Sequence, residues 1–128
     1  MNAARLLIVI VGIILPYVVR IPSGPAWVMQ YTSAGVTGFL FLEAFNAIAW
    51  GSLLALSLVI RRPVALLIPC LSGFGYLARA HATLDLAADA QAGIALVFIP
   101  FYALLPIAIG GLVGYLVDRG LTGGDAGG

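Results

Sequence analysis

The stretch from Ala92 to Val117, AGIALVFIPFYALLPIAIGGLVGYLV, contains no charged side chain. A helix rises about 1.5 Å per residue, so this stretch is long enough to cross the ~30 Å hydrocarbon core of a bilayer. Pro100 and Pro106 lie inside it and predict a kink or a locally loosened hydrogen-bond ladder. We therefore expect a transmembrane helix here, and this expectation sets the fold class for the rest of the chain.

Three further apolar stretches precede this one and have a similar character. The first lies between Arg5 and Arg20 and is short for a bilayer, so we expect both arginine side chains to extend toward the membrane surface. The third begins at Pro63, a residue suited to a first helical turn. The four predicted helices cover residues 3–20, 33–60, 63–82 and 92–117.

The composition supports a membrane protein and excludes several other classes. Of the 128 residues, 62% are hydrophobic and only 9% are charged, whereas soluble domains carry about 25% charged residues. A net charge of +1 provides no basic surface for nucleic acid, and one Cys and one His cannot build a disulfide framework or a zinc finger. The sequence predicts an all-α polytopic membrane protein, a four-transmembrane-helix bundle with short loops in residues 1–119, followed by a flexible Gly-rich tail at 120–128.

Arginine placement predicts the orientation of these helices in the membrane. With four spans, one side of the membrane collects four arginines and the other side collects Arg20 and Arg79. Under the positive-inside rule the first side is cytoplasmic. We therefore expect both termini in the cytoplasm of a bacterium and the chain in its inner membrane. The four arginines of the cytoplasmic side are Arg5, Arg61, Arg62 and Arg119.

Glu43 is the most informative polar residue because it lies inside the second predicted helix, among phenylalanines and leucines. An ionised carboxylate in hydrocarbon costs several kcal/mol, so it must be protonated, paired or facing water. Asn46 and Trp50 follow on the same helical face. These three residues are our candidates for a substrate or proton pathway. The alternative is structural: a protonated Glu43 bonds a neighbouring helix and Asn46 holds helices together.

A second polar group comprises His81, Asp85 and Asp89. If residues 83–91 are helical, these side chains form a stripe at i, i+4 and i+8, which could hold a metal or pass protons. The sequence leaves open whether 83–91 extends the helix or forms a loop. One His and two carboxylates make a thin ligand set, so we predict a solvated helix end and no metal site. Between the first two helices, Trp27 and Tyr31 are expected to anchor a short turn at the headgroup level.

Small residues at helical spacing indicate close helix packing. Such residues let backbones approach each other in lipid, within one chain or between copies. They are Ala47, Gly51 and Ala55 in the second helix and Gly110 and Gly114 in the fourth.

These observations predict an oligomeric transporter or channel-like protein for a small solute or ion, with Glu43 as its proton-coupling residue. The alternative is a non-catalytic accessory or assembly subunit of a larger membrane complex. An enzyme using His81 and Asp85 ranks last, because the sequence offers too few candidate nucleophiles and metal ligands. We expect no cofactor and no nucleic-acid partner. The expected partners are the lipid bilayer and either further copies of the chain or a larger membrane complex.

Overall fold

A computed structural model describes residues 3–88 and 91–127 of the chain. These residues contain helices and no strand, and four of the helices are long and apolar enough to cross a membrane. The prediction of an all-α four-helix membrane bundle is therefore confirmed. The elements are α1 (Ala3–Val18), the short 3-10 helix η1 (Ile21–Ser23), α2 (Pro25–Thr32), α3 (Gly35–Leu56), α4 (Pro63–Thr83) and α5 (Ala92–Gly127).

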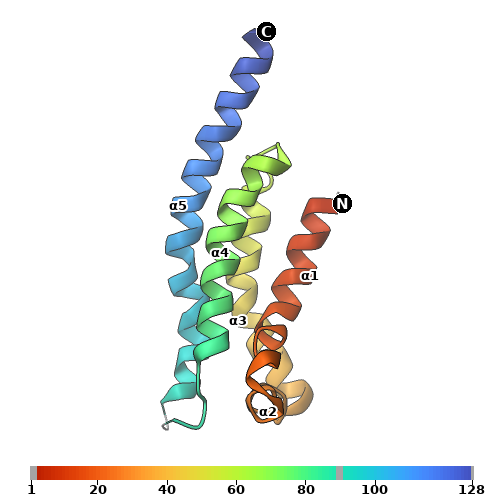
Figure 1. Cartoon of the computed structure of the whole chain (residues 1–128), viewed down its shortest axis with the longest axis vertical. Coiled ribbons are helices and arrows are strands. Elements are labelled where there is room, and N and C mark those ends of the chain that lie inside the picture. Colours follow the sequence, from red (N-terminus) through yellow and green to blue (C-terminus); the bar gives the residue numbers. More distant parts are fainter. Residues whose placement is uncertain (1–2, 89–90, 128) are drawn as a thin grey trace.

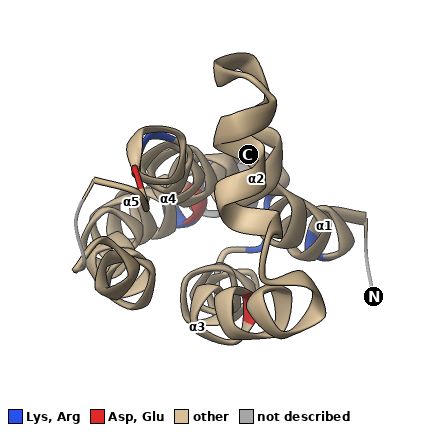
Figure 2. Ribbon diagram, turned by 90° about the horizontal axis from the view of Figure 1, so that it is seen from below, with Lys and Arg blue, Asp and Glu red and all other residues tan. Residues whose placement is uncertain are grey.

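The four long helices run alternately up and down the bundle (Figure 1). Both termini and the turn between α3 and α4 lie at one end, and α2 and the connection from α4 to α5 lie at the other. Helix α1 packs against α3 and α4, and α5 packs against the same two helices. Seen along the bundle, charged positions are few (Figure 2). We call the two ends the terminal end and the α2 end.

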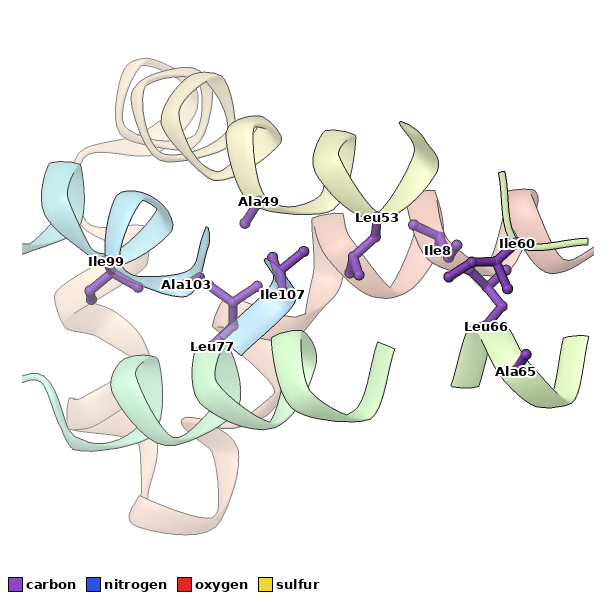
Figure 3. Close-up of a cluster of buried hydrophobic side chains, with 10 residues drawn as sticks. All are labelled: Ile8, Ala49, Leu53, Ile60, Ala65, Leu66, Leu77, Ile99, Ala103 and Ile107. Atoms are coloured by element: carbon purple, nitrogen blue, oxygen red, sulfur yellow. The ribbon is translucent and has the colours of Figure 1, made fainter. Parts of the chain in front are cut away.

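The interior of the bundle is filled by aliphatic side chains from all four long helices (Figure 3). Large apolar side chains also cover the outside: Leu71 is 70% exposed and Leu105 is 68% exposed. In water this much exposed apolar surface would drive association, whereas lipid accommodates it. The buried cluster comprises Ile8, Ala49, Leu53, Ile60, Ala65, Leu66, Leu77, Ile99, Ala103 and Ile107.

The largest differences from the predicted helix boundaries are in α3 and α5. The segment predicted as one helix at 33–60 begins only at Gly35, whose φ of 65° is the left-handed conformation that glycine tolerates, and ends at Leu56. Helix α5 was expected to end at Val117 but continues to Gly127, through the segment predicted as a separate flexible tail. No proline follows Pro106 in this helix, and adding a residue to an existing helix requires little free energy.

The two glycines of the last helix form a close seam between α4 and α5. A Cβ atom on Gly110 would lie 2.9 Å from the Cα of Pro69, and one on Gly114 would lie 2.7 Å from the carbonyl oxygen of Ala65. Only glycine permits this approach. On α3, by contrast, a Cβ atom on Gly51 would meet nothing within 4 Å. The seam at Gly110 and Gly114 thus packs helices within the chain, whereas Gly51 has open space beside it.

The side chain of Asp118 in α5 holds this helix to the α3–α4 turn. Its carboxylate is 5% exposed and accepts hydrogen bonds from the backbone N–H of Arg61 at 3.2 Å and of Arg62 at 2.9 Å. Arg62 is the N-cap of α4, with extended backbone because Pro63 follows it. A carboxylate at this position also interacts favourably with the positive N-terminal end of the α4 dipole. Asp118 therefore fixes the last helix to the start of α4.

Candidate functional site

A group of polar side chains lies between α1 and α3, inside the apolar bundle. We call Tyr17, Glu43, Asn46 and Trp50 the α1–α3 polar cluster. Both carboxyl oxygens of Glu43 are buried and have no hydrogen-bond partner among the described residues. The Tyr17 hydroxyl, the Oδ1 atom of Asn46 and the indole N–H of Trp50 are buried and unpartnered in the same way. Since most buried polar groups are hydrogen-bonded, such a concentration of unsatisfied atoms marks a candidate site.

The predicted face of Glu43, Asn46 and Trp50 contacts α1. A Cβ atom on Gly12 would lie 2.5 Å from Cγ of Trp50, so the indole lies directly against the α1 backbone. Tyr17, farther along α1, lies within electrostatic range of Glu43. The structure therefore brings the three predicted residues to one helix–helix interface. It adds Tyr17, which the sequence reasoning missed.

Asn46 has one well-defined partner, and a proline explains it. Pro16 has no N–H, so the carbonyl oxygen of Gly12, four residues earlier, lacks its usual partner within α1. The side-chain amide of Asn46 donates to this oxygen at 2.8 Å. In hydrocarbon, carbonyls released by proline need a donor from a neighbouring helix. Asn46 thus supplies the hydrogen bond that the α1 backbone lacks at Gly12, whereas its own Oδ1 atom has no partner among the described residues.

A line of aromatic rings leads from this cluster toward the α2 end. The Phe39 and Tyr17 rings stack with centroids 6.0 Å apart. Tyr17 then meets Tyr31 edge to face at 6.2 Å, and Tyr31 meets His81 in the same manner at 5.6 Å. The rings come from α3, α1, α2 and α4 in turn. They connect the surroundings of Glu43 with a second polar cluster, built around Arg20.

Arg20 is fully buried, so the prediction that it extends to the membrane surface is wrong. Its guanidinium donates to the carbonyl oxygens of His81 at 2.6 Å and Leu84 at 2.7 Å, at the C-terminal end of α4. It also donates to Trp27 O at 2.8 Å and to Gln30 Oε1 at 2.9 Å. Cations stabilise helix C-termini, and this arrangement gives the charge four acceptors away from water. The Arg20 cluster comprises Arg20, Trp27, Gln30, Tyr31, His81 and Asp85.

The predicted stripe of His81, Asp85 and Asp89 does not form. Helix α4 ends at Thr83 and Leu84 is extended, so Asp85 does not lie one helical turn beyond His81. Asp85 instead accepts hydrogen bonds from Gln30 Nε2 at 2.9 Å and from the N–H of Ala87 at 3.0 Å. The latter is a local turn of the kind that aspartate favours. Asp89 lies outside the described residues, and no three His, Cys, Asp or Glu side chains among the described ones could hold a metal ion.

His81 is fully buried, which contradicts the prediction of a solvated helix end. Its Nδ1 atom is 2.8 Å from the Tyr31 hydroxyl, and its Nε2 atom is buried without a partner among the described residues. Burial raises the pKa of the Tyr31 hydroxyl above its usual range, although Arg20 acts in the opposite direction. The phenol therefore keeps its proton at neutral pH and remains available for hydrogen bonding to His81.

Trp27 and Tyr31 were predicted as anchors facing the headgroups, but both point into the bundle. The indole N–H of Trp27 donates to the carbonyl oxygen of Ala82 at 2.8 Å, and Tyr31 is 6% exposed. The Arg20 guanidinium lies over both rings, 3.9 Å from the Tyr31 centroid and 4.5 Å from the Trp27 centroid. Their aromatic faces thus help to hold the buried cation.

Comparison with protein-family models, with curated proteins and with solved structures finds no match for this chain. Function is therefore inferred from the two clusters. Sequence reasoning identified Glu43, Asn46 and Trp50 as one face and His81 as a residue of interest. It missed Tyr17, Gln30 and the central role of Arg20. A possible signal for Tyr17 was its position beside Pro16, whose missing N–H draws polar groups to this part of α1.

Proposed function

We propose that this protein is a small membrane transporter or channel-like protein for a small solute or ion, in which Glu43 couples transport to a proton. The observation that carries this proposal is the burial of both Glu43 carboxyl oxygens without a hydrogen-bond donor. An ionised carboxylate in such surroundings costs several kcal/mol, so the neutral acid is the stable form in this conformation. Ionisation of Glu43 requires water or a cation to reach the site. A transport cycle can therefore alternate between a closed state with protonated Glu43 and an open state with ionised Glu43.

The residues beyond Glu43 favour a proton as the coupling ion. The hydroxyls of Tyr17 and Tyr31 and the imidazole of His81 belong to the aromatic line toward the α2 end. Hydroxyl and imidazole groups can both accept and donate protons. Asn46 and Trp50 complete the polar lining on the other side of Glu43, where they would contact a solute that enters when α1 and α3 separate.

The proposed setting is the inner membrane of a bacterium, with both termini in the cytoplasm. Arginine placement supports this orientation, and the burial of Arg20 strengthens it because that side chain does not face the α2-end surface. Assembly into homo-oligomers is part of the proposal. The open space beside Gly51, together with the exposed Ala55 on the same helix, offers a small-residue face for a second copy.

One observation favours a second candidate function, an accessory or assembly subunit of a larger membrane complex. The Asn46 amide bonds the Gly12 carbonyl directly, which is a packing role that requires no transport. In this alternative, Glu43 and Asn46 only fix the contact between α1 and α3.

Proton flux in proteoliposomes tests the proposal. Purified protein is reconstituted, a potassium diffusion potential is imposed with valinomycin, and internal pH is followed with a trapped dye. We expect flux above that of protein-free liposomes, loss of this flux in Glu43→Gln, and full flux in Arg79→Gln, which changes an exposed residue of the α2 end. The amide keeps the shape of the acid, and circular dichroism should show the same helix content in all three proteins.

Two outcomes would contradict the transport proposal. One is wild-type flux equal to that of empty liposomes at every diffusion potential applied. The other is unchanged flux in a folded Glu43→Gln protein. Either result would favour the accessory role, in which a neutral Glu and a Gln both serve to pack helices.

A further inference from the structure

An apolar groove of about 750 Å³ runs along the side of the bundle between α1 and α4. It is lined by aliphatic side chains from both helices, the ring of Phe74 and Gly75. From Pro63 to Ala78 it follows α4 over about 22 Å at ~1.5 Å per residue, more than half the ~30 Å hydrocarbon thickness. We call this feature the α1–α4 groove. It shares no residue with the α1–α3 polar cluster or the Arg20 cluster.

A more polar pocket of about 280 Å³ lies beside the groove at the terminal end. The two spaces share Ala4, Pro63 and Leu66 in their linings, so they are adjacent. Ser57 and Arg61 line the smaller pocket. The apolar α1–α4 groove thus has a polar pocket, which we call its mouth, beside it at the terminal end of the bundle.

The mouth is rich in positive charge. The Arg61 side chain is exposed there, and Arg5 donates from Nε to the Ser57 hydroxyl at 3.0 Å, which places a second guanidinium at the same rim. The nearby carboxylate of Asp118 is engaged with the backbone N–H groups of the α3–α4 turn. An anion at the mouth would therefore meet arginine side chains.

We propose that the α1–α4 groove binds one anionic phospholipid, with an acyl chain along the groove and the phosphate against Arg61 and Arg5. Three observations lead to this occupant. The volume lies within the ~300–1,000 Å³ range of ligand sites. The groove is apolar over its length, as an acyl chain requires. The arginines are at one end only, where a lipid presents its headgroup, and basic pockets between transmembrane helices hold acidic lipids.

Native mass spectrometry of the full chain in detergent tests this site, with phosphatidylglycerol and phosphatidylcholine as the probes. We expect the wild type to retain one phosphatidylglycerol more tightly than phosphatidylcholine. Arg61→Gln should reduce that preference about fivefold, the effect of one arginine at an anionic headgroup. Gly75→Leu should weaken both lipids, because a Cβ atom at Gly75 meets nothing within 4 Å and the longer side chain would occupy the groove without a clash at its base.

Matched variants separate this site from general effects. Arg79→Gln removes an exposed arginine at the other end, and Gly93→Leu adds the same side chain at an open glycine of α5. Both should bind lipid as the wild type does. The proposal would be overturned by equal binding of the two lipids, or by wild-type binding in Arg61→Gln and Gly75→Leu. It would also fail if Gly75→Leu dissociated a dimer, since a second copy would then occupy the groove. None of these results depends on proton flux.

Discussion

Replacing Asn46 with Ala tests whether this side chain stabilises α1 by donating to the Gly12 carbonyl, which Pro16 leaves without a backbone donor. The substitution removes the 2.8 Å hydrogen bond to the Gly12 carbonyl, and Asn46 is only 1% exposed, so water cannot readily replace it. Leaving a buried acceptor unpaired costs about 1–3 kcal/mol in water-soluble proteins, whereas hydrogen bonds between transmembrane helices average about 0.6 kcal/mol. With the small cavity included, we expect a loss of about 2 kcal/mol in the free energy of unfolding.

A second substitution isolates the hydrogen bond from the cavity. Pro16→Ala restores an N–H group that can bond the Gly12 carbonyl within α1. In the Pro16→Ala background, Asn46→Ala should lower the free energy of unfolding by about 1 kcal/mol less than in the wild type. The cavity left by the substitution is the same, but the Gly12 carbonyl then keeps a hydrogen bond within α1. The measurement is equilibrium unfolding in mixed micelles with increasing dodecyl sulfate, followed by circular dichroism.

A proline elsewhere provides the control for this cycle. Pro100 is also buried within a helix, but it lies in α5, so Pro100→Ala should leave the cost of Asn46→Ala unchanged. Equal costs of Asn46→Ala in the wild-type and Pro16→Ala backgrounds, to within about 0.3 kcal/mol, would refute the role assigned to Asn46.

Two further pairs of substitutions, each with its own control, test the packing described above. Arg20→Met should lower the free energy of unfolding by about 3–5 kcal/mol, because it removes a fully buried guanidinium that donates four hydrogen bonds. Arg79→Met on the exposed surface should change it by less than ~1 kcal/mol, and similar values for both would contradict the buried position of Arg20. Gly110→Ala should lower the thermal midpoint at a cost of about 1–3 kcal/mol, and Gly51→Ala should be neutral or stabilising by up to ~1 kcal/mol. Equal stability of the two alanine variants would show that α4 and α5 can move apart at Gly110 without a loss in the free energy of unfolding, which would contradict the close packing described here.

The fold could be predicted from the sequence because lipid imposes a simple rule on length and polarity. The uncharged stretch around Pro100 and Pro106 is long enough to indicate a membrane-spanning helix, and the structure has a helix there. Pro63 was predicted to begin a helix, and α4 does begin at this residue. Helix ends were harder to predict. The break before Gly35 depends on one backbone angle, and the end of α4 at Thr83 depends on carbonyl groups that accept hydrogen bonds from Arg20, in the turn after α1. Such ends are fixed by tertiary contacts that local sequence does not contain.

The candidate site was predictable only in part. The spacing of Glu43, Asn46 and Trp50 places them on one helical face whatever the fold, so their grouping followed from the sequence. The environment of Arg20 did not follow, because an arginine beside an apolar run can either reach the membrane surface or turn inward. The inward orientation of Arg20 depends on carbonyl acceptors that lie 61 and 64 positions later in the chain.

That separation bears on how the protein is made. When α1 leaves the ribosome, the acceptors for Arg20 in α4 have not yet been synthesised, and only Trp27 and Gln30 follow closely. A guanidinium without its partners stays hydrated, so the nascent α1 must hold this residue at the membrane surface until α4 has entered the bilayer. The burial of Arg20 is then a late step of biogenesis, and it joins the first helix to the third of the four membrane-spanning segments. Translation products that stop before His81 would lack two of the four acceptors of this guanidinium.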